Sequence, residues 1–494
     1  MTQNLKYIPY IRLRSILFVV LLLVSGHSIG QGEMDNWFFG NKAGLNFSTG
    51  SPQVIPESAI NSIEACASIS DSDGNLLFYS EASKIFNRNH VVMLNGNLYS
   101  NSNNATQGAG IVPMPGNSYK YYVFSLRFTG DFMCALKYDI VDMFRDFNRG
   151  EVIEKDHFLL YGITEKLTFV QQRDSPNVWI IVHGFNSDEY AVFLISASGI
   201  SEATTFATGI THGRRYGYLQ PSPDGSMLAA AVETGFNSDG FIEVSRFDPL
   251  EGSISESFKL EIPGGPYGVC FSPDNSKLYA TAGSPNHLYQ FDLSQQEPNL
   301  IQDSRVQITS TPFIDYPGSI GALQLAPNGK IYLARYETNS LAAINQPNLL
   351  GTECAYVENA VSLDGSGSCE GGLPNFGNLF LDQTPANILG GTDPDDTDEP
   401  EDPDEPDEPN QQPECGDLII IPNPTAGSII VKSLGEEISS ITVYDIRGRL
   451  VVPKTAFNSV EVQIDEAQLL AAGTYILQVA HGWCVNEKKV VVMR

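Results

Sequence analysis

The sequence has few positive charges and none of the short motifs that mark common metal or redox sites. Its 494 residues include 29 Lys and Arg against 58 Asp and Glu, which gives a formal net charge of −29. Such an excess of negative charge repels phosphate backbones and anionic lipid surfaces, so we expect no nucleic-acid partner. No C-x-x-C, H-x-H or H-E-x-x-H motif occurs, and the sequence therefore predicts no metal site and no cofactor.

The leucine-rich periodicity of helices is also missing. Glycine (44 residues) and proline (29 residues) are frequent instead, which favours short strands joined by tight turns. The chain is longer than one hydrophobic core usually supports, so we expect two domains or one large repeat architecture.

The first thirty residues have the pattern of a cleavable signal peptide. Lys6, Arg12 and Arg14 precede an apolar run at 15–24 that is too short to span a bilayer. We expect cleavage after residue 30 and no transmembrane segment in the mature chain. The stretch GHSIG at 26–30 matches the serine-hydrolase motif G-x-S-x-G, but it lies at the cleavage site and lacks the flanking strand and helix that this motif needs.

A repeated pattern fills residues 34–385. A short apolar strand, a turn rich in Pro, Asp, Asn and Gly, and a second apolar strand recur six times, at 65–80, 110–125, 167–184, 218–232, 269–282 and 323–335. The turns are roughly 42 to 59 residues apart, the length of a four-stranded propeller blade. Two leftover pieces, 36–55 and 371–382, together predict a seventh blade, in which strand 371–382 pairs with the strand containing Trp37–Gly40 and hides the sheet edges.

Through its SPDG and SPDN turns, this region resembles the seven-bladed propellers of the lactonase and WD40-like group. The resemblance implies the fold and leaves the activity open, because the group includes both enzymes and binding domains.

The final part of the chain changes character twice. Residues 386–414 are an acidic, proline-rich linker, for which we expect an extended spacer, with calcium binding as the alternative. Residues 415–494 alternate apolar and polar positions between turns and predict a small β-sandwich. The predicted fold class is therefore all-β: a seven-bladed β-propeller followed by a small sandwich domain.

The sandwich resembles the type A C-terminal sorting domain of the type IX secretion system. The matching residues lie in three ordered blocks and a basic terminal strand: Pro422, Asn423, Pro424, Gly427, Tyr444, Asp445, Gly448, Gly473, Tyr475, Lys488 and Lys489. The resemblance implies recognition by the outer-membrane translocon and then a sortase, so that the cargo is released or attached to the outer cell surface.

Seven cysteines in an exported chain suggest disulfides. We expect the pairs Cys354–Cys369 and Cys415–Cys484. Cys66 and Cys270 lie in strand-like apolar runs, where buried free thiols are expected.

Loops that enter the inner strands of a propeller meet at the mouth of its central channel. The polar and aromatic candidates for ligand binding on those loops are Glu64, Gln107, Lys166, Arg215, Tyr216, Tyr267, Glu370 and Asn375. Arg214 and Arg215 either receive a carboxylate, as on an acidic sugar, or pair with an acid of a neighbouring blade. Tyr216 and Tyr267 either stack on a sugar ring or pack within the channel.

These features favour a binding module for extracellular polysaccharide or protein rather than an enzyme. One alternative is a hydrolase or lactonase in which Glu64 and Glu370 supply acid–base chemistry. Another is a structural adhesin or envelope component. A tight carboxylate cluster at the channel mouth would favour the enzyme, and exposed aromatic residues would favour glycan binding.

Overall fold

The computed structural model describes residues 32–381 and 418–492, apart from gaps at 100–101, 130–131, 236–238, 284–285, 296, 311–317, 422–427, 434–436, 446–449, 465–472 and 482–483. The predicted signal peptide and acidic linker lie outside these residues. The chain divides into a first unit of residues 1–140 and 154–389 and a second that contains residues 390–494. Among the described residues, no helix combines the length and the apolar character needed to cross a membrane.

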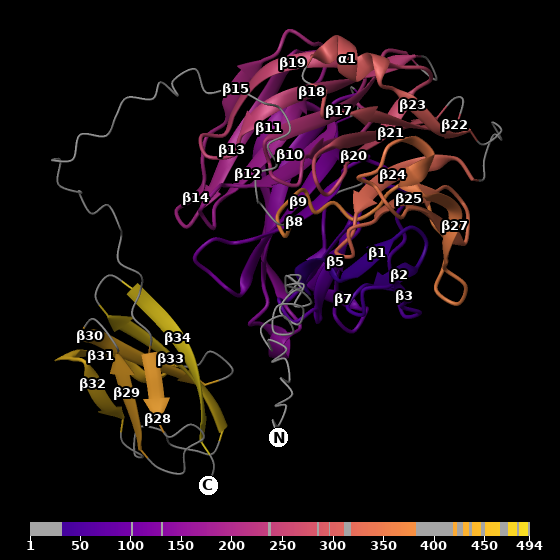
Figure 1. Cartoon of the computed structure of the whole chain (residues 1–494). Coiled ribbons are helices and arrows are strands. Elements are labelled where there is room, and N and C mark those ends of the chain that lie inside the picture. Colours follow the sequence, from indigo (N-terminus) through magenta and orange to yellow (C-terminus); the bar gives the residue numbers. More distant parts are fainter. Residues whose placement is uncertain are drawn as a thin grey trace, which may run out of the picture. The chain divides into compact units, whose positions relative to one another are not determined.

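The first unit is a seven-bladed β-propeller whose sheets are arranged around a common centre (Figure 1). Three blades are separate four-stranded antiparallel sheets. Their strands are β16 (Leu219–Pro221), β17 (Met227–Glu233), β18 (Gly240–Asp248), β19 (Ser253–Ile262), β20 (Pro266–Phe271), β21 (Lys277–Gly283), β22 (Asn286–Asp292), β23 (Val306–Ser310), β24 (Ile320–Leu325), β25 (Ile331–Arg335), β26 (Ser340–Ile344) and β27 (Tyr356–Ser362).

Three further blades share one 12-stranded sheet because β7 and the long strand β11 pair with each other. The first half of β11 continues one blade beside β10, and its second half pairs with β12 as the inner strand of the next blade. The strands are β4 (Ala67–Ser70), β5 (Leu76–Ser80), β6 (Lys84–Asn87), β7 (Val92–Asn97), β8 (Ala109–Pro113), β9 (Lys120–Phe128), β10 (Cys134–Asp142), β11 (Glu151–Gln171), β12 (Val178–Gly184), β13 (Glu189–Ser196), β14 (Gly199–Ile200) and β15 (Thr204–Ala207).

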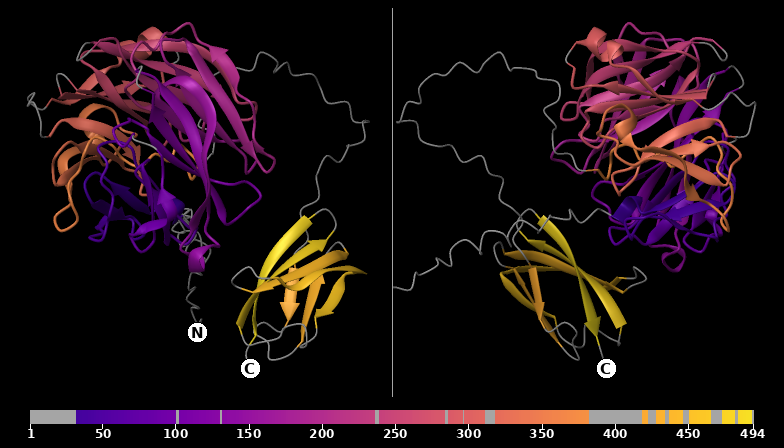
Figure 2. Two further views of the ribbon diagram at one scale, coloured as in Figure 1. Left: turned by 180° about the vertical axis from the view of Figure 1, so that it is seen from behind. Right: turned by 45° about the vertical axis from the view of Figure 1, so that its right-hand side comes forward.

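The seventh blade contains β1 (Asn36–Phe39), β2 (Ala43–Asn46) and β3 (Gln53–Val54). Helical segments in the described chain are short: η1 (Gly32–Met34), η2 (Asp146–Asn148), α1 (Pro298–Asp303) and η3 (Gly351–Cys354). The views in Figure 2 show the same sheets from behind and after a turn of 45° about the vertical axis.

Each of the six predicted repeats forms the hairpin between the first two strands of a blade. In the SPDG turn, the Ser222 hydroxyl donates to Asp224 Oδ1 at 2.6 Å and accepts a bond from the Met227 amide at 2.9 Å. The SPDN turn repeats the first of these bonds between Ser272 and Asp274 at 2.7 Å. Gly225 in the first turn and Asn275 in the second adopt positive φ angles, the conformation for which Gly and Asn are favoured.

The prediction for the closing strand was wrong. Residues 371–381 form no strand, and the only strand that β1 pairs with among the described residues is β2. Instead, a single bridge joins Asn41 to Ser368, after which the chain crosses the centre of the propeller. Pro374 cannot donate a ladder hydrogen bond, and Gly377 adopts a φ of +60°, so this segment is poorly suited to a strand. We call residues 371–381 the closing segment.

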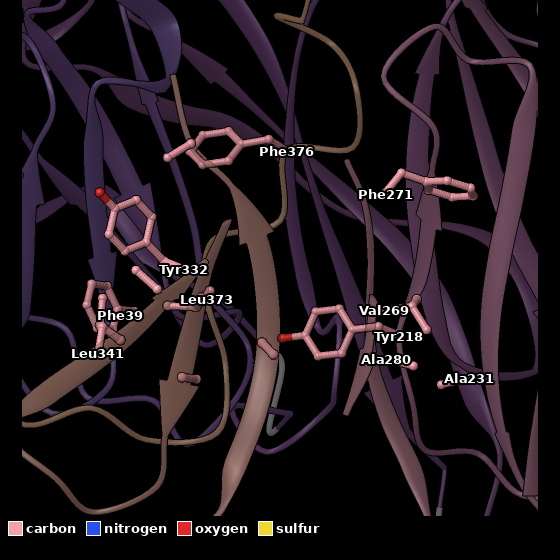
Figure 3. Packing of buried hydrophobic residues seen from close by; sticks show 14 of the residues in the cluster. Phe39, Tyr218, Ala231, Val269, Phe271, Ala280, Tyr332, Leu341, Leu373 and Phe376 are labelled. Atoms are coloured by element: carbon pink, nitrogen blue, oxygen red, sulfur yellow. The ribbon is translucent and has the colours of Figure 1, made fainter. Parts of the chain in front are cut away.

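The closing segment is held by several inner strands. The amide of Asn375 donates to Cys66 O at 3.1 Å, and its side chain donates to Leu167 O at 2.9 Å and Ala109 O at 3.4 Å. Leu373 and Phe376 belong to the large apolar cluster of the propeller, together with Phe39, Tyr218 and Tyr332 (Figure 3). The centre is therefore occupied by packed side chains of this segment.

The predicted Cys354–Cys369 disulfide is absent, and both thiols are free and buried. Cys354 packs with the strands of the fifth and sixth repeats, whereas Cys369 lies with Cys66 in the central cluster. Cys369 Sγ instead accepts a bond from the Arg335 amide at 3.3 Å, and burial raises the pKa of its thiol to about 12. The predicted Cys415–Cys484 pair lies outside the residues whose side chains are described.

The second unit is the predicted sandwich of two antiparallel sheets. One contains β28 (Leu418–Ile421), β29 (Ile429–Ser433) and β32 (Glu461–Ile464). The other contains β30 (Ile438–Asp445), β31 (Leu450–Ser459), β33 (Gly473–His481) and β34 (Cys484–Val492). Alternate residues such as Ile429 and Val431 in β29 are buried in a core with Leu477 and Val479 of β33. This alternation explains why the sequence pattern predicted strands here.

Candidate functional site

A ring of backbone hydrogen bonds brings the predicted loops together at the centre of the propeller. Successive links run from Glu64 N to Asn103 O (3.1 Å), Gln107 N to Glu165 O (3.2 Å), Glu165 N to Arg215 O (2.9 Å), Tyr218 N to Tyr267 O (2.8 Å), Ala322 N to Gly371 O (3.0 Å) and Gly371 N to Ile63 O (2.8 Å). The link between β20 and β24 is made by a side chain instead. The Thr281 hydroxyl accepts a hydrogen bond from Gly268 N and donates one to Gly321 O, both at 2.9 Å. The loops that carry the candidates are therefore joined to one another around the centre.

Two of the predicted ligand-binding residues are used to hold the blades together. Gln107 is buried, donates to Leu219 O at 2.9 Å and accepts from the Leu219 amide at 2.7 Å. Asn375 is buried in the closing segment and joins three inner strands, as described above. Both side chains are buried, and their amide groups donate to backbone carbonyls of the inner strands.

Arg215 lies between a carboxylate and two aromatic rings. Its Nε is 2.7 Å from Glu165 Oε1, an acid on the neighbouring blade, which is the ion-pair alternative drawn from the sequence. Its guanidinium carbon lies 4.6 Å from the centre of the Phe128 ring and 5.0 Å from that of Tyr216. Glu165 is itself fixed by two 2.8 Å bonds from the amide and hydroxyl of Thr106. The Arg215 side chain remains 23% exposed, so this held cation still meets solvent.

Glu64 lies near this pair. Burial of its carboxyl, followed by repulsion from Glu165, raises the pKa of Glu64 to about 8, although Tyr267 and Arg215 oppose the shift. The Glu64 carboxyl is therefore largely protonated at neutral pH. Burial also raises the pKa of Glu165, against the opposing effects of Thr106 and Arg215, and Glu165 is the acid that contacts Arg215. Tyr267 packs edge-on against Tyr218, with ring centres 5.6 Å apart.

Lys166 is fully enclosed next to Glu165. Its ammonium donates to Tyr216 O at 2.6 Å. Burial lowers the pKa of Lys166 to about 7, and attraction to Glu165, Glu243 and Glu233 offsets only part of this effect. Lys166 is therefore a buried, readily deprotonated amine in the interior of the propeller.

Glu370 directly precedes Gly371 of the closing segment. It is half-buried, and burial followed by repulsion from Glu337 raises its pKa. The repulsion that raises the pKa of Glu64 comes from Glu165.

An open cavity of about 200 Å³ lies against Arg215. Its lining consists of three aromatic residues, two arginines and one glycine: Phe132, Phe185, Tyr216, Arg214, Arg215 and Gly213. Arg214 Nε lies 3.9 Å from Glu233 Oε2, a loose ion pair, and the arginine side chain is 36% exposed. Phe132 is 72% exposed, as expected for a residue at the rim of a binding surface rather than in a core. The cavity thus combines aromatic faces with positive charge in a strongly acidic chain.

Sequence reasoning placed Arg214, Arg215 and Tyr216 at this mouth but missed Phe132, Phe185 and Glu165. Phe132 and Phe185 occur in turns rich in Gly, Asp and Asn, where a large apolar side chain has no obvious core to enter. An apolar side chain in a polar turn could therefore have marked Phe132 and Phe185 as candidates. No sequence feature marked Glu165, because only the fold shows which blade its carboxylate faces.

Comparison with known proteins identifies one region. Residues 419–493 match the family model described as a secretion system C-terminal sorting domain. Of the residues that carried this expectation, Tyr444 and Asp445 end β30, Gly473 and Tyr475 lie in β33, and Lys488 and Lys489 lie in β34. Pro422, Asn423, Pro424, Gly427 and Gly448 fall outside the described residues. No curated protein matches the chain.

Among solved structures, the propeller is similar to several others at low identity. The periplasmic gluconolactonase of Pseudomonas aeruginosa is 14% identical with a TM-score of 0.32, over 78% of this chain and 89% of that one. A putative 6-phosphogluconolactonase from Bacteroides uniformis is 12% identical with a TM-score of 0.34, over 81% of this chain and 100% of that one. At these scores the likeness supports no argument of its own, and the propeller assignment rests on the sheets.

The sorting domain establishes the destination of the chain. It is a cargo of the type IX secretion system and is exported to the cell surface or the medium. The propeller therefore works outside the cell.

Proposed function

We propose that this protein is an extracellular binding module whose propeller holds a carboxylate-bearing polysaccharide at the cavity beside Arg215. The observation that carries the proposal is the lining of that cavity, with exposed or half-buried aromatic residues around two arginines. Aromatic faces pack against sugar rings, and arginine matches the geometry of a carboxylate. The cavity is below the usual range of about 300–1,000 Å³ for small-molecule sites, so it fits one sugar unit of a longer chain.

The local charge supports an anionic ligand in spite of the acidic chain. With Glu64 largely protonated, Glu165 is the acid of this pair that contacts Arg215. Arg214 makes a loose contact with Glu233, so it can turn to a carboxylate in the cavity. An incoming uronic acid therefore meets one cation, Arg215, that is already held in place, which reduces the ordering cost of binding.

The test uses the purified full-length chain and polygalacturonate, a polymer of a carboxylated sugar, against a neutral glucan. Binding to polygalacturonate that weakens with salt is expected, since the contact is ionic. Phe132→Ala should reduce affinity about two- to tenfold, the effect of losing one aromatic stacking contact. Phe158→Ala is the matched control, because Phe158 is 60% exposed and does not line the cavity.

Arg214→Gln tests the ionic part of the proposal. It should remove most of the preference for polygalacturonate over the neutral glucan, whereas Arg88→Gln, at an exposed arginine outside the cavity, should leave the preference unchanged. Equal binding of the two polymers by the wild-type chain, or equal effects of the two arginine variants, would show that the cavity is not the site.

A second candidate function is acid–base hydrolysis. It is favoured by the carboxyl of Glu64, which keeps its proton at neutral pH beside Glu165, as a general acid requires. The measurement is release of reducing ends or opening of sugar lactones, with expected loss of rate above pH 8 and in Glu64→Gln. Hydrolysis that persists in Glu64→Gln, or no hydrolysis in the wild type, would eliminate this candidate.

A further inference from the structure

A second polar cluster, separate from Glu64 and Glu165, is enclosed between two neighbouring blades. His183 lies near the end of β12, His212 precedes β16, and Glu243 lies in the middle of β18. All three side chains have no exposed area. One potential ligand atom from each lies within 4.8 Å of the others, and within the described residues this is the only such group of three.

The hydrogen bonds of His183 fix which nitrogen is free. Its Nδ1 lies 2.8 Å from Gly184 O. A carbonyl oxygen only accepts, so Nδ1 carries the hydrogen and Nε2 of the neutral ring presents a lone pair. That Nε2 is buried and has no hydrogen-bond partner. A backbone carbonyl that accepts from the opposite nitrogen is the usual support of a metal-binding histidine.

His212 has a comparable arrangement. Its Nε2 lies 2.6 Å from Glu243 Oε2, and its Nδ1 is buried with no hydrogen-bond partner. Glu243 is in turn supported by Ser245, whose hydroxyl donates to Glu243 Oε1 at 3.4 Å. A buried nitrogen without a partner is costly, and two of them beside one carboxylate indicate a missing binding partner.

We infer that His183, His212 and Glu243 form a binding site for one divalent transition-metal ion of the zinc type. Two imidazoles and one carboxylate are a recurrent zinc ligand set, which leaves a further position for water. Calcium and magnesium prefer oxygen ligands throughout, so this set selects against them. The site was not visible in the sequence, because the three ligands are spread over three strands and loops of two blades.

Metal binding requires a local rearrangement. The two imidazole rings stack with their centres 3.4 Å apart and their planes 8° from parallel, so their lone pairs lie in nearly parallel planes and do not meet at one point. An ion bound by both rings therefore turns at least one of them out of the stack. Turning His212 would exchange its 2.6 Å contact with Glu243 Oε2 for the ion, whereas turning His183 would break its bond to Gly184 O.

The cavity borders the two chain segments that carry the histidines. Phe185 and Gly213 line it, and they follow His183 by two residues and His212 by one. A metal ion at the cluster would fix both segments that carry these lining residues. This inference concerns the ion alone and stands whether or not the cavity binds a polysaccharide.

The experiment is a titration of the chelator-treated full-length chain with Co²⁺, followed by visible absorption. One equivalent should bind with the strong bands of a four- or five-coordinate site containing nitrogen, and Zn²⁺ should displace it. Excess Ca²⁺ is present throughout, so that weak binding to the acidic linker is suppressed. Bound Zn²⁺ should also raise the unfolding temperature relative to the chelated chain.

Variants locate the ion. His183→Ala and His212→Ala should each weaken Co²⁺ binding at least tenfold, while His287→Ala, at a histidine outside the cluster, should bind as the wild type does. Circular dichroism verifies that each variant is folded. The inference is overturned if the wild-type chain takes up no equivalent of Co²⁺, a result that does not depend on any variant. It is also overturned if folded His183→Ala keeps the same bands.

Discussion

The amide of Gly371 donates a 2.8 Å hydrogen bond to the carbonyl oxygen of Ile63, although the two residues stand at opposite ends of the propeller sequence. The carbonyl of the same glycine accepts from Ala322 at 3.0 Å. Gly371 therefore joins the last inner strand to the first loop with both of its backbone groups. Ring closure depends on this close approach of three backbones as well as on the sheet of the seventh blade.

Gly321→Ala should weaken this closure. A Cβ atom there would lie 2.4 Å from Gly371 O, a backbone atom that cannot move without breaking the ring. We expect a loss of about 1–3 kcal/mol in the free energy of unfolding. Urea unfolding is followed by fluorescence in a full-length chain that carries Trp483→Phe, so that Trp37 and Trp179 report on the propeller.

Gly283→Ala is the matched control for this substitution. Its nearest neighbour would be Gly265 O at 3.9 Å, an ordinary contact, so its effect should be smaller. Equal losses for the two alanine variants would mean that the approach at Gly371 is unimportant for stability.

Glu64→Gln should stabilise the protein increasingly as pH rises. In the wild type the folded pKa of Glu64 is about 8 and its usual value is 4.5, so the unfolded carboxyl ionises first and stability falls between these pH values. Glutamine has no such loss. The variant should melt near the wild-type temperature at pH 5 and be more stable by about 1–3 kcal/mol at pH 8. A stability difference that does not change with pH would contradict the raised pKa.

Lys166→Met should show the opposite trend. The folded pKa of Lys166 is about 7 and its usual value is 10.5, so the cost of burying the charge is complete below pH 7 and disappears as pH rises to 10.5. Methionine carries no charge, and its advantage over lysine should be greatest at pH 6 and shrink at pH 10. The measurement is the same set of melting curves. An advantage that grows with pH would show that Lys166 is not a buried, readily deprotonated amine.

Cys354 and Cys369 should both be free thiols in the exported protein. They lie in different apolar clusters and are enclosed, so they should react with a thiol reagent only after unfolding. Mass mapping of unreduced peptides provides the measurement. A cross-linked peptide that contains both residues would contradict the structure.

Deletion of residues 415–494 should strand the protein in the periplasm. The sorting domain at 419–493 is the part that the secretion machinery recognises. The assay is fractionation of native host cells that express full-length and truncated chains, each tagged inside a propeller loop. If the truncated chain reached the surface or medium as efficiently as the full-length chain, the role of this domain as the export signal would have to be abandoned.

The blade repeats could be predicted because each hairpin is a local structure. The turn at Ser222–Gly225 carries its own hydrogen bonds, so neighbouring residues specify it. The path of the closing segment could not be predicted, because Asn375 and Asn378 bond to strands about two hundred residues earlier in the sequence. The same reason explains why Arg215 was predicted and its partner Glu165 was not. The repeat pattern places Arg215 on a loop at the channel mouth, whereas its contact with Glu165 on the neighbouring blade depends on the assembled ring.

The position of the closing segment also sets an order of events during export. A chain that emerges with its N-terminus first presents the first blades long before residues 371–381. The carbonyl oxygens of Cys66 and Leu167 can bond to Asn375 only when this later segment has emerged. Contacts so distant in sequence form slowly, because a large loop must close first. The ring can therefore be completed only after residues 371–381 have emerged, and only the linker and the sorting domain follow them in the chain.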